Sequence, residues 1–464
     1  MSPRAGDGAV LLVSEARGEF AMVEGIRAEL DRVGVESVHV TAHSTDVSAD
    51  ELSRAGAIAL DRHPAFAEAF GTGAGDLVNA VRDAEGELDA NLRRVWQADL
   101  RSWREGEPDD WMARLALGYL AAWRQILAGR GRVGVIWGED GGHLAKRIVF
   151  LLAERRKIPL SFLYVSPLPG RMLHLDNALN HFSRDGLAGV APTIEERAYA
   201  ERLLADVRGS RVQFATPRDL SFRPRRVIRL GRLLIERYVT RPPGAVAHYP
   251  WRFARLYARQ RTVRAASRVA YRSLGTRPFV FHPIHAGFDA QITIRAPQWW
   301  DQLALVEHIA ASLPYGYELA VKEHPFEVGA LPPARLLGLL RRHPEIRLLH
   351  PTIHAHDALR ACSAVTTVNS TTGFEALFFG RPLVTFGHSP YRGLGLTYDV
   401  ESTFDTPAIL ARALRGEPAP EQEVIRLIAF LHRRSFAAVS LAYDTGGENL
   451  RRYAEFFAAR ADGR

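Results

Sequence analysis

The stretch AVTTVNSTTGFEALFFGRPLVTFG, from Ala364 to Gly387, decides the fold of the second half of the chain. Its β-branched beginning predicts a strand over residues 364–368, and the segment after Gly373 favours a helix. A second apolar run follows Gly380, so the order is strand, turn, helix, turn and strand. This order is typical of a parallel sheet covered by helices.

The turn between that strand and the helix is rich in hydrogen-bonding side chains. Asn369, Ser370, Thr371 and Thr372 follow one another there. Backbone N–H groups and the helix dipole favour an anion such as phosphate at the start of a helix. An ordinary N-cap, with Glu375 completing a capping box, needs only one such residue. We therefore expect a phosphate-binding turn, in which Glu375 alternatively accepts hydrogen bonds from a ribose.

Two other segments place polar side chains just after a predicted strand. One contains Lys322, His324 and Pro325, and the other contains His282 and His285. In open α/β sheets ligands bind at the carboxyl ends of the strands. We expect Lys322 and His324 to hold phosphate oxygens, and the other two histidines to contact sugar or phosphate.

The composition is that of an ordinary globular protein. The chain has 464 residues, of which 47% are hydrophobic and 24% are charged. A chain of this length is too long to pack around one hydrophobic core, so we predict two domains. There is no run of roughly 18 apolar residues that would span a membrane, and the first residues lack a signal-peptide core. A single cysteine, Cys362, excludes a disulfide framework, and we expect a cytoplasmic protein.

Positive charge is concentrated in the segment 218–277. The whole chain has a net charge of +8, whereas this segment has 16 Arg against two acids, 16 − 2 = +14. It also carries aromatic residues, a combination suited to an anionic membrane face or an anionic glycan. A solvated helix pair between the domains is the alternative. No nucleic-acid-binding motif accompanies the segment, so we expect no nucleic-acid partner.

The first half of the chain predicts a second α/β domain. Strand patterns cover 9–13, 35–41, 133–137 and 160–165, helices are predicted over 22–33 and 144–156, and residues 50–129 have a helical pattern. The expected architecture is two Rossmann-like, doubly wound domains facing a cleft, with a helical insertion in the first domain.

The domain boundaries follow from these patterns. We expect an acceptor-side domain over 1–217 that includes the helical region of about 50–129, and an Arg-rich helical linker over 218–277. A nucleotide-sugar-binding domain over 278–435 and a C-terminal helix over 436–464 complete the chain. Helices are predicted over 421–437 and 447–459. The sequence leaves open on which of the two domains they pack.

The loop from Gly138 to His143 carries the best candidates for a general base. Glu139 and Asp140 follow a predicted buried strand beside glycines, where a carboxylate can deprotonate an acceptor hydroxyl. An N-cap at Asp140 is the alternative. His143, and Arg171 in a polar loop predicted over 166–177, are candidates for the acceptor side.

The sequence offers no clear ligand set for a metal or a cofactor. No Asp-x-Asp motif follows an apolar strand to hold a divalent ion. The single glycine between 14 and 20 is far short of a dinucleotide fingerprint. We therefore expect charge neutralisation by Lys, His and a helix end, without metal or cofactor.

The second half resembles the capsule polysaccharide biosynthesis family of bacterial glycosyltransferases, which includes Kdo transferases of the GT-B fold. The resemblance covers residues 278–400 and is carried by 281–285, 301–307, 321–325, 368–377 and 380–384. It implies that His324 and Ser370 to Thr372 hold the phosphate of a nucleotide sugar, with CMP-Kdo as the favoured donor. It also implies an inverting transfer without an obligatory metal.

These observations lead to one main hypothesis and two alternatives. The main hypothesis is a glycosyltransferase that moves a sugar from a nucleotide donor to a surface polysaccharide or glycolipid, at the inner face of the bacterial plasma membrane. The first alternative is a nucleotide-sugar 2-epimerase. The second is a non-catalytic polysaccharide export or binding protein of the same fold.

Overall fold

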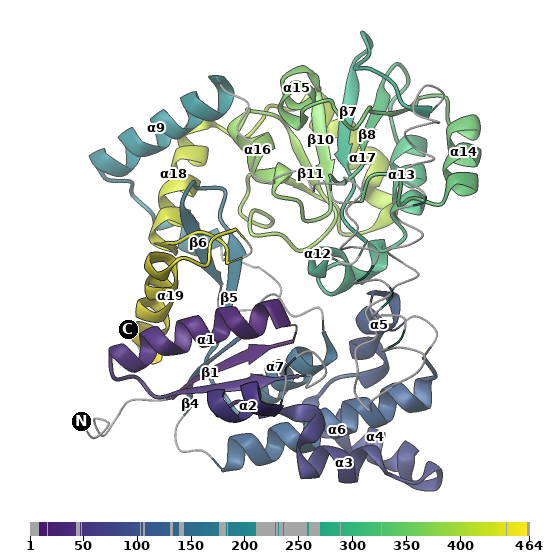
Figure 1. Cartoon of the computed structure of the whole chain (residues 1–464). Helices are drawn as coiled ribbons and strands as arrows, with labels where there is room; N and C mark the ends of the chain where they lie inside the picture. The colour runs from purple at the N-terminus through teal and green to yellow at the C-terminus, as the bar shows by residue number, and fades with distance from the viewer. Residues whose placement is uncertain are drawn as a thin grey trace. The chain divides into compact units, whose positions relative to one another are not determined.

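The computed structural model describes residues 9–15, 17–42, 47, 49–102, 104, 107–129, 133–138, 143–175, 182, 184–209, 228, 231, 235, 258, 270–287, 289–325, 327–441 and 443–461. It contains two compact α/β units (Figure 1). Unit 1 holds the described residues of 1–178, 224–250 and 435–464, and unit 2 holds those of 179–223 and 251–434. Most of the Arg-rich segment 218–277 lies outside the described residues.

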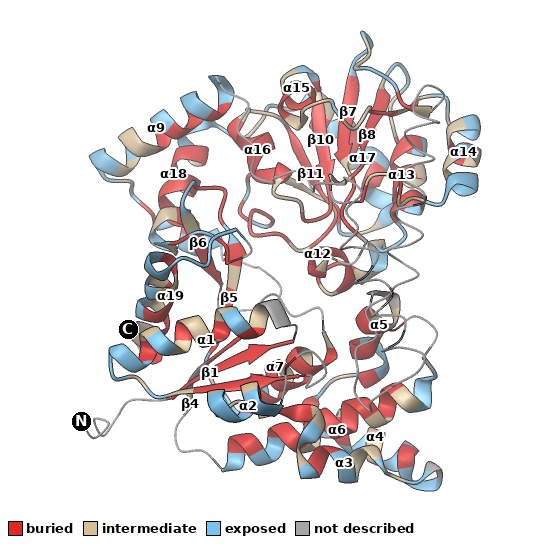
Figure 2. Ribbon diagram, in the orientation of Figure 1, coloured by how far each residue is buried: buried red, intermediate tan, exposed pale blue. Residues whose placement is uncertain are grey.

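Unit 1 is built on a seven-stranded sheet with the order β13-β6-β5-β4-β1-β2-β3. Strands β5 to β3 pair in parallel, whereas β6 and β13 add an antiparallel edge. All six residues of β1 are buried, as expected for a central strand covered on both faces (Figure 2). The strands are β1 (Ala9–Ser14), β2 (Ser37–Thr41), β3 (Ile58–Ala59), β4 (Val133–Gly138), β5 (Leu160–Val165), β6 (Arg171–Leu175) and β13 (Ser435–Ala437).

The helical insertion expected in the first domain is confirmed, with the short strand β3 inside it. Its longest helix, α6, is apolar around most of its circumference, and Trp123 links it to α7 by donating a hydrogen bond to the Ala145 carbonyl at 3.0 Å. The helices of unit 1 are α1 (Arg17–Arg32), α2 (Ala49–Ala55), η1 (Leu60–Arg62), α3 (Pro64–Phe70), α4 (Ala74–Leu88), α5 (Leu92–Ser102), α6 (Asp109–Ala128), α7 (Leu144–Arg155) and α19 (Gly447–Ala461).

The last residues of the chain complete unit 1. Helix α19 packs on α1 and on the sheet, where the Phe457 ring lies 5.1 Å from the Trp137 ring. The helix predicted over 421–437 ends earlier than expected, at Arg433, and 435–437 form β13. Phe436 explains the change, because it stacks on Phe456 of α19 at 4.3 Å between ring centres.

The polar loop predicted over 166–177 is in part a strand. Residues 171–175 form β6, which pairs with β5 through a hairpin. Gly170 has a φ of +68° at the start of that strand, a conformation that favours glycine. Only the residues before β6 form the turn that the sequence predicts. Within the strand, Leu173 is fully buried.

Unit 2 has a six-stranded sheet with the order β12-β11-β10-β7-β8-β9, and every pair in it is parallel. The chain moves outward from β7 to β9 on one side, then crosses to β10 and moves outward to β12. The strands are β7 (Phe279–Pro283), β8 (Glu318–Lys322), β9 (Ile346–Leu348), β10 (Ala364–Thr367), β11 (Leu383–Thr385) and β12 (Tyr398–Asp399). The expectation of two Rossmann-like α/β units is confirmed.

Helices cover both faces of this second sheet. Figure 1 shows α13 and α14 on one side of the strands and α15 and α16 on the other. Apolar residues of α13, α14 and α17 form one core with β7 and β8. The helices of unit 2 are α8 (Arg184–Ala188), α9 (Ile194–Gly209), α12 (Ala290–Thr293), η3 (Pro297–Trp299), α13 (Gln302–Ala311), α14 (Pro333–Arg342), α15 (Ala355–Ala361), α16 (Thr372–Phe378), η4 (Thr403–Asp405), α17 (Thr406–Arg415) and α18 (Glu421–Arg433).

Helix α9 belongs to unit 2, although the expected first domain extends to residue 217. Arg208 donates a hydrogen bond to the Phe378 carbonyl at 2.7 Å. Arg433 forms an ion pair with Glu196 at 2.7 Å. These contacts hold α9 against α16 and α18. None of the helices that the structure describes has the length and apolar character needed to cross a membrane.

Replacing Phe457 by Ala tests whether α19 is part of unit 1. The ring is fully buried, and removing such a side chain costs about 3–5 kcal/mol. We expect the free energy of unfolding, measured with urea, to fall by this amount. Glu455→Ala in the same helix removes an exposed side chain, and it should change stability by less than about 0.5 kcal/mol. Equal effects of the two changes would contradict the packing of α19.

Candidate functional site

Unit 2 brings two groups of predicted site residues to one place in its sheet. His282 and His285 come from the carboxyl end of β7, and Asn369 and Ser370 follow β10. These two strands are neighbours, and the chain leaves them toward opposite edges of the sheet. Such a switch point is where open α/β sheets bind ligands.

A direct contact joins the two groups. The backbone N–H of Asn369 donates to His285 Nε2 at 3.1 Å. Gln302 fixes the backbone of His285 from both sides, with bonds of 2.7 and 2.9 Å. Because an N–H group donates to Nε2, the neutral ring carries its proton on Nδ1. Asn369 is itself buried, and its amide donates to the Gln291 carbonyl at 2.6 Å.

His282 lies deeper in the same region. Its Nδ1 lies 2.9 Å from the Thr366 hydroxyl, and its Nε2 is buried without a hydrogen-bond partner among the residues that the structure describes. Burial lowers the pKa of His282 to about 4. Burial, with smaller contributions from His324 and His282, lowers the pKa of His285 to about 3. Both rings are therefore neutral at neutral pH and offer hydrogen bonds rather than positive charge.

The turn after β10 uses most of its donors internally. Ser370 N donates to Thr367 Oγ1 at 3.1 Å, and Thr372 N donates to Ser370 Oγ at 3.2 Å. Gly373 N donates to the Ser370 carbonyl at 2.9 Å. Thr371 differs, because its N–H and hydroxyl have no partner within the described part of the chain. Ser370 thus stabilises the turn, and Thr371 has the donors that a ligand can use.

Gly373 is required by packing inside the turn. A Cβ at this position would overlap the ring of Tyr391. Tyr391 is fully buried, and its hydroxyl donates to the Ser370 carbonyl at 2.7 Å. The glycine therefore makes room for a tyrosine that closes the turn.

The capping box, which was the alternative interpretation of this turn, is not formed. Thr371 is the N-cap of α16, and no side chain caps it. Glu375 is buried, and its Oε1 lies 3.4 Å from Nε2 of His356. Glu375 therefore has a partner inside the protein, and it would have to leave that partner to accept hydrogen bonds from a ribose.

The carboxyl end of β8, which neighbours β7 in the sheet, supplies a cation. Lys322 is 8% exposed, and its Nζ donates to the Pro351 carbonyl at 3.0 Å. Burial lowers its pKa to about 8, while the Glu323 charge acts in the opposite direction. Burial also lowers the pKa of His324 to about 4, although the charge of Glu327 acts to raise it. Pro325 follows His324 in the chain. At neutral pH Lys322 carries the positive charge, and His324 is neutral.

The predicted residues of unit 1 have different outcomes. Glu139 and Asp140 lie outside the described residues. Arg171 donates to the hydroxyl and the carbonyl of Ser435 at 2.7 and 2.6 Å, so it holds β13 against β6. His143 precedes α7, and its Nδ1 lies 2.9 Å from Oε2 of Glu15.

Sequence reasoning missed the buried charges around His143. They are Glu15, Asp99, Arg104 and Lys146, each at most 5% exposed. One signal was available for Asp99, because it lies seven residues after Leu92 on the apolar face of α5. A carboxylate in an apolar stripe marks a buried polar contact.

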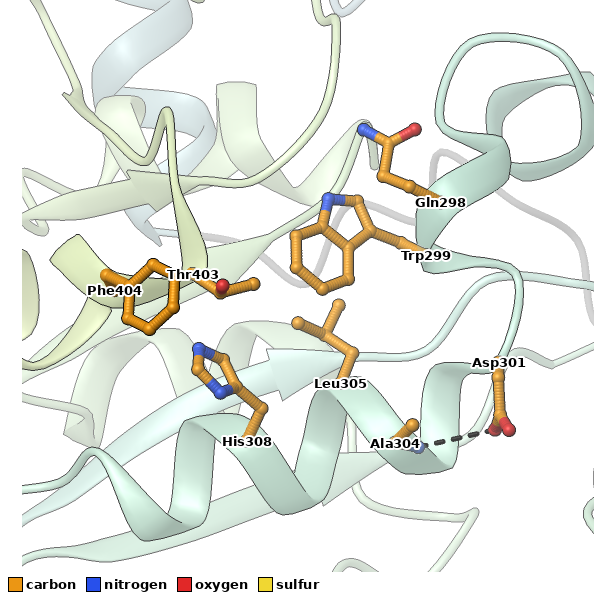
Figure 3. Close-up of a pocket in the computed structure, with 8 residues that line it drawn as sticks. All are labelled: Gln298, Trp299, Asp301, Ala304, Leu305, His308, Thr403 and Phe404. Carbon is orange, nitrogen blue, oxygen red and sulfur yellow. Dashed lines mark hydrogen bonds between the residues drawn. The ribbon is translucent and has the colours of Figure 1, made fainter.

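A pocket of about 420 Å³ lies elsewhere in unit 2, between α13, η3 and η4 (Figure 3). Trp299, Leu305 and Phe404 give it an apolar lining. Its one acidic side chain, Asp301, caps α13 and pairs with Arg335 at 2.8 Å. No lysine or arginine lines this pocket, so it lacks a permanent positive charge for a phosphate. Within the described ranges no group of three His, Cys, Asp or Glu side chains is placed to hold a metal ion.

Comparisons with known proteins match part of the chain to one family model. Residues 237–409 match the family model described as capsule polysaccharide biosynthesis protein, which agrees with the resemblance expected over 278–400. The protein FixF of Sinorhizobium fredii (strain NBRC 101917 / NGR234) is 29% identical over 119 residues. The match covers 24% of this chain and 27% of FixF, so the chain spans about a quarter of that relative's length.

Solved structures also show similarity. The beta Kdo 2,4 transferase KpsC of Thermosulfurimonas dismutans is 15% identical, with a TM-score of 0.37 over 70% of this chain and 87% of that chain. A UDP-GlcNAc 2-epimerase of Methanocaldococcus jannaschii is 13% identical, with a TM-score of 0.28 over 92% and 99% of the two chains. Values this low carry no information about the substrate of this chain.

Replacing Gly373 by Ala tests the close approach of Tyr391. The added methyl group would force the buried ring to move, and such overpacking costs about 1–3 kcal/mol. Gly338→Ala is a matched control, because Gly338 lies within α14 with room for a Cβ. That change should stabilise the helix by about 0.5–1 kcal/mol. Urea unfolding measures both, and a stabilising Gly373→Ala change would contradict the packing.

The two buried histidines predict a loss of stability in mild acid. The unfolded chain takes up protons near the ordinary histidine pKa of 6.5, whereas folded His282 stays neutral until about pH 4. Lowering the pH through this window therefore favours the unfolded state, by at most about 1.4 kcal/mol per pH unit for each group. His282→Gln should make the fall in unfolding free energy between pH 6.5 and 4 shallower. An unchanged slope would show that His282 is protonated in the folded protein.

Proposed function

We propose that this chain, whose residues 237–409 carry the signature of the capsule polysaccharide biosynthesis family, is a glycosyltransferase. It moves a sugar from a nucleotide donor to a capsule polysaccharide or another surface glycan or glycolipid. The observation that carries the proposal is the set of polar groups at the switch point between β7 and β10, within the family segment. Donor binding at a switch point is the general behaviour of such sheets.

Unit 2 binds the donor in this proposal. Lys322 supplies the positive charge for the phosphate, and Thr371 supplies an N–H and a hydroxyl. His282, His285 and His324 act as neutral hydrogen-bonding groups toward phosphate or sugar. Pro325, Asn369, Ser370, Thr372 and Glu375 shape the surroundings of these groups. The favoured donor is CMP-Kdo, bound without a metal ion.

Unit 1 activates the acceptor in this proposal. A base takes the proton from the acceptor hydroxyl, and the oxygen attacks the anomeric carbon of the donor sugar. The bond between that carbon and the phosphate oxygen breaks, and its electron pair leaves with the nucleotide. A single displacement of this kind inverts the anomeric configuration. Glu139 and Asp140 are the proposed bases, and His143 and Arg171 belong to the acceptor side.

The place of action is the inner face of the bacterial plasma membrane. The Arg-rich segment 218–277 is the proposed contact with an anionic membrane surface or an anionic glycan. Acidic headgroups and acidic sugars present the same chemistry to such a segment, which supports a site where a lipid-linked acceptor is within reach.

Donor binding tests the proposal. The protein should bind CMP-Kdo more tightly than UDP-GlcNAc or GDP-mannose, as measured by thermal shift and titration calorimetry. Lys322→Ala removes a charge-assisted contact worth about 1.5–3 kcal/mol, so the dissociation constant should rise about 10- to 100-fold. His343→Ala is the control, because His343 precedes β9 at the opposite end of the strands. It should bind the donor as the wild type does.

The outcomes separate the proposal from its rivals. Release of CMP that depends on an added glycolipid acceptor supports transfer. Conversion of UDP-GlcNAc without any acceptor would identify a nucleotide-sugar 2-epimerase instead. Failure to bind any of the three nucleotide sugars would leave a polysaccharide export or binding protein as the better description.

A further inference from the structure

The pocket of unit 2 in Figure 3 is separate from the residues that the proposed function uses. It is formed by α13, η3 and η4, and its volume is about 420 Å³. None of the side chains proposed to hold the donor lines it. Sites for small molecules have volumes of about 300–1,000 Å³ and combine an apolar lining with a few polar groups. The pocket has both properties, so a small organic ligand fits it by size.

Two aromatic side chains border the pocket, together with Leu305 (Figure 3). Trp299 is half-buried, and it packs on the core of the second sheet. Phe404 belongs to η4 and is 92% exposed. The face of an aromatic ring carries partial negative charge, so the weakly positive C–H groups of a ligand pack well on it. The two rings therefore suit a ligand that has a C–H surface.

Three polar side chains at the same pocket have unused hydrogen-bonding capacity. The Gln298 amide and the Thr403 hydroxyl have no hydrogen-bond partner in the described part of the chain. Nε2 of His308 lies 2.8 Å from the Thr406 hydroxyl, whereas Nδ1 has no partner among the same residues. An amide and a hydroxyl both donate and accept, and Nδ1 does one or the other according to the tautomer. Ligand hydroxyl groups, which also donate and accept, can satisfy all three side chains.

The charged groups at the pocket neutralise each other. Asp301 is its one acidic side chain, and it pairs with Arg335 at 2.8 Å. Asp301 also accepts a hydrogen bond from Ala304 N at 3.3 Å. A carboxylate has about four acceptor positions, so Asp301 retains capacity for a ligand hydroxyl. Because no unpaired lysine, arginine or acid lines the pocket, its chemistry favours a neutral ligand over a phosphate or an ammonium group.

Hydrogen bonds hold the walls of the pocket in place. The indole N–H of Trp299 donates to the Phe386 carbonyl at 2.8 Å, which ties η3 to the residue after β11. Ser402 caps η4 by accepting a hydrogen bond from Phe404 N at 3.3 Å. The contact between the histidine and Thr406 joins α13 to the first residue of α17. A surface that is fixed before the ligand arrives loses less conformational entropy on binding.

We infer that this pocket binds a neutral sugar residue of a glycan. The C–H face of the sugar ring packs on Trp299 and Phe404. Its hydroxyl groups pair with Gln298, Thr403 and His308. The inference goes beyond the proposed function, because the pocket holds a glycan without taking part in transfer. A polysaccharide-binding protein of the same fold would use it in the same way.

Two other occupants fit the pocket less well. A nucleobase would also stack on the rings, but the phosphate attached to it would find no lysine or arginine among the lining residues. A second copy of the chain would cover Phe404. It would also bury Gln298 and Thr403, and a polar group that is buried without a partner weakens an interface.

Binding of neutral sugars to the full-length protein tests the inference directly. The probes are the methyl glycosides of glucose, galactose, mannose, rhamnose and N-acetylglucosamine, with methyl galacturonate glycoside as the acidic comparison. One stacked ring with a few hydrogen bonds gives a dissociation constant of about 1 mM. We expect at least one neutral glycoside to bind in this range, as measured by saturation-transfer NMR and titration. Binding of none of them, or a preference for the acidic sugar, would overturn the inference.

Two substitutions locate the bound sugar. Phe404→Ala removes an exposed ring and should raise the dissociation constant about 5- to 10-fold. Thr403→Val removes a hydroxyl at nearly constant shape and should raise it about 2- to 10-fold. Tyr315→Ala is the matched control, because Tyr315 is an exposed aromatic residue of unit 2 that does not line the pocket. This control should bind as the wild type does, and wild-type affinity in Phe404→Ala would contradict the inference.

The results are independent of the proposed function, because the binding test needs neither donor nor transfer. A protein that transfers nothing from CMP-Kdo, yet binds a neutral glycoside through Phe404, would end the proposed function and support the inference. Transfer by a protein that binds no neutral glycoside would do the reverse. Sedimentation velocity tests the rival occupant. Self-association that Phe404→Ala abolishes, without any sugar binding, would identify the pocket as a contact between copies and overturn the inference.

Discussion

The parallel pairing of a central strand with neighbours on both sides is the constraint on which both candidate sites depend. In unit 2 the central strand is β7, and in unit 1 it is β1. Connections that leave toward opposite edges cannot cover the ends of the two middle strands. Polar residues gather at these uncovered ends, including His285 with Asn369 in one unit and Glu15 with His143 in the other.

Much of the fold could be predicted from local patterns, since β-branched runs and helical periodicity reveal most central strands and helices. The missed elements depend on distant partners. β13 has three residues, and it is a strand because β6 and α19 lie beside it. α9 joins unit 2 through an ion pair between Glu196 and Arg433, 237 residues apart. No window along the sequence contains both members of such pairs.

In unit 2 the sequence indicated which strand ends carry polar groups, and it indicated the chemistry of these groups less well. Residue types indicated where polar groups follow strands, but they did not show burial. Burial makes His282 and His285 neutral, although histidines beside a phosphate-binding turn suggest positive charge. Likewise, the sequence gives no sign that Gly373 makes room for the buried ring of Tyr391. Lys322 is still positively charged at neutral pH. Burial lowers its pKa only to about 8, because the ordinary pKa of lysine is high.

Unit 1 is built from the first part of the chain and from residues 435–464, which affects the order in which its parts are synthesised. A ribosome makes the strands β1 to β6 long before β13 and α19, while the residues from 251 to 434 that build most of unit 2 form one uninterrupted stretch. Domains fold as units as they emerge. The side of α1 that packs on α19 therefore stays uncovered until residues 447–461 are made. The part of the chain that is translated first is therefore the last to be completed.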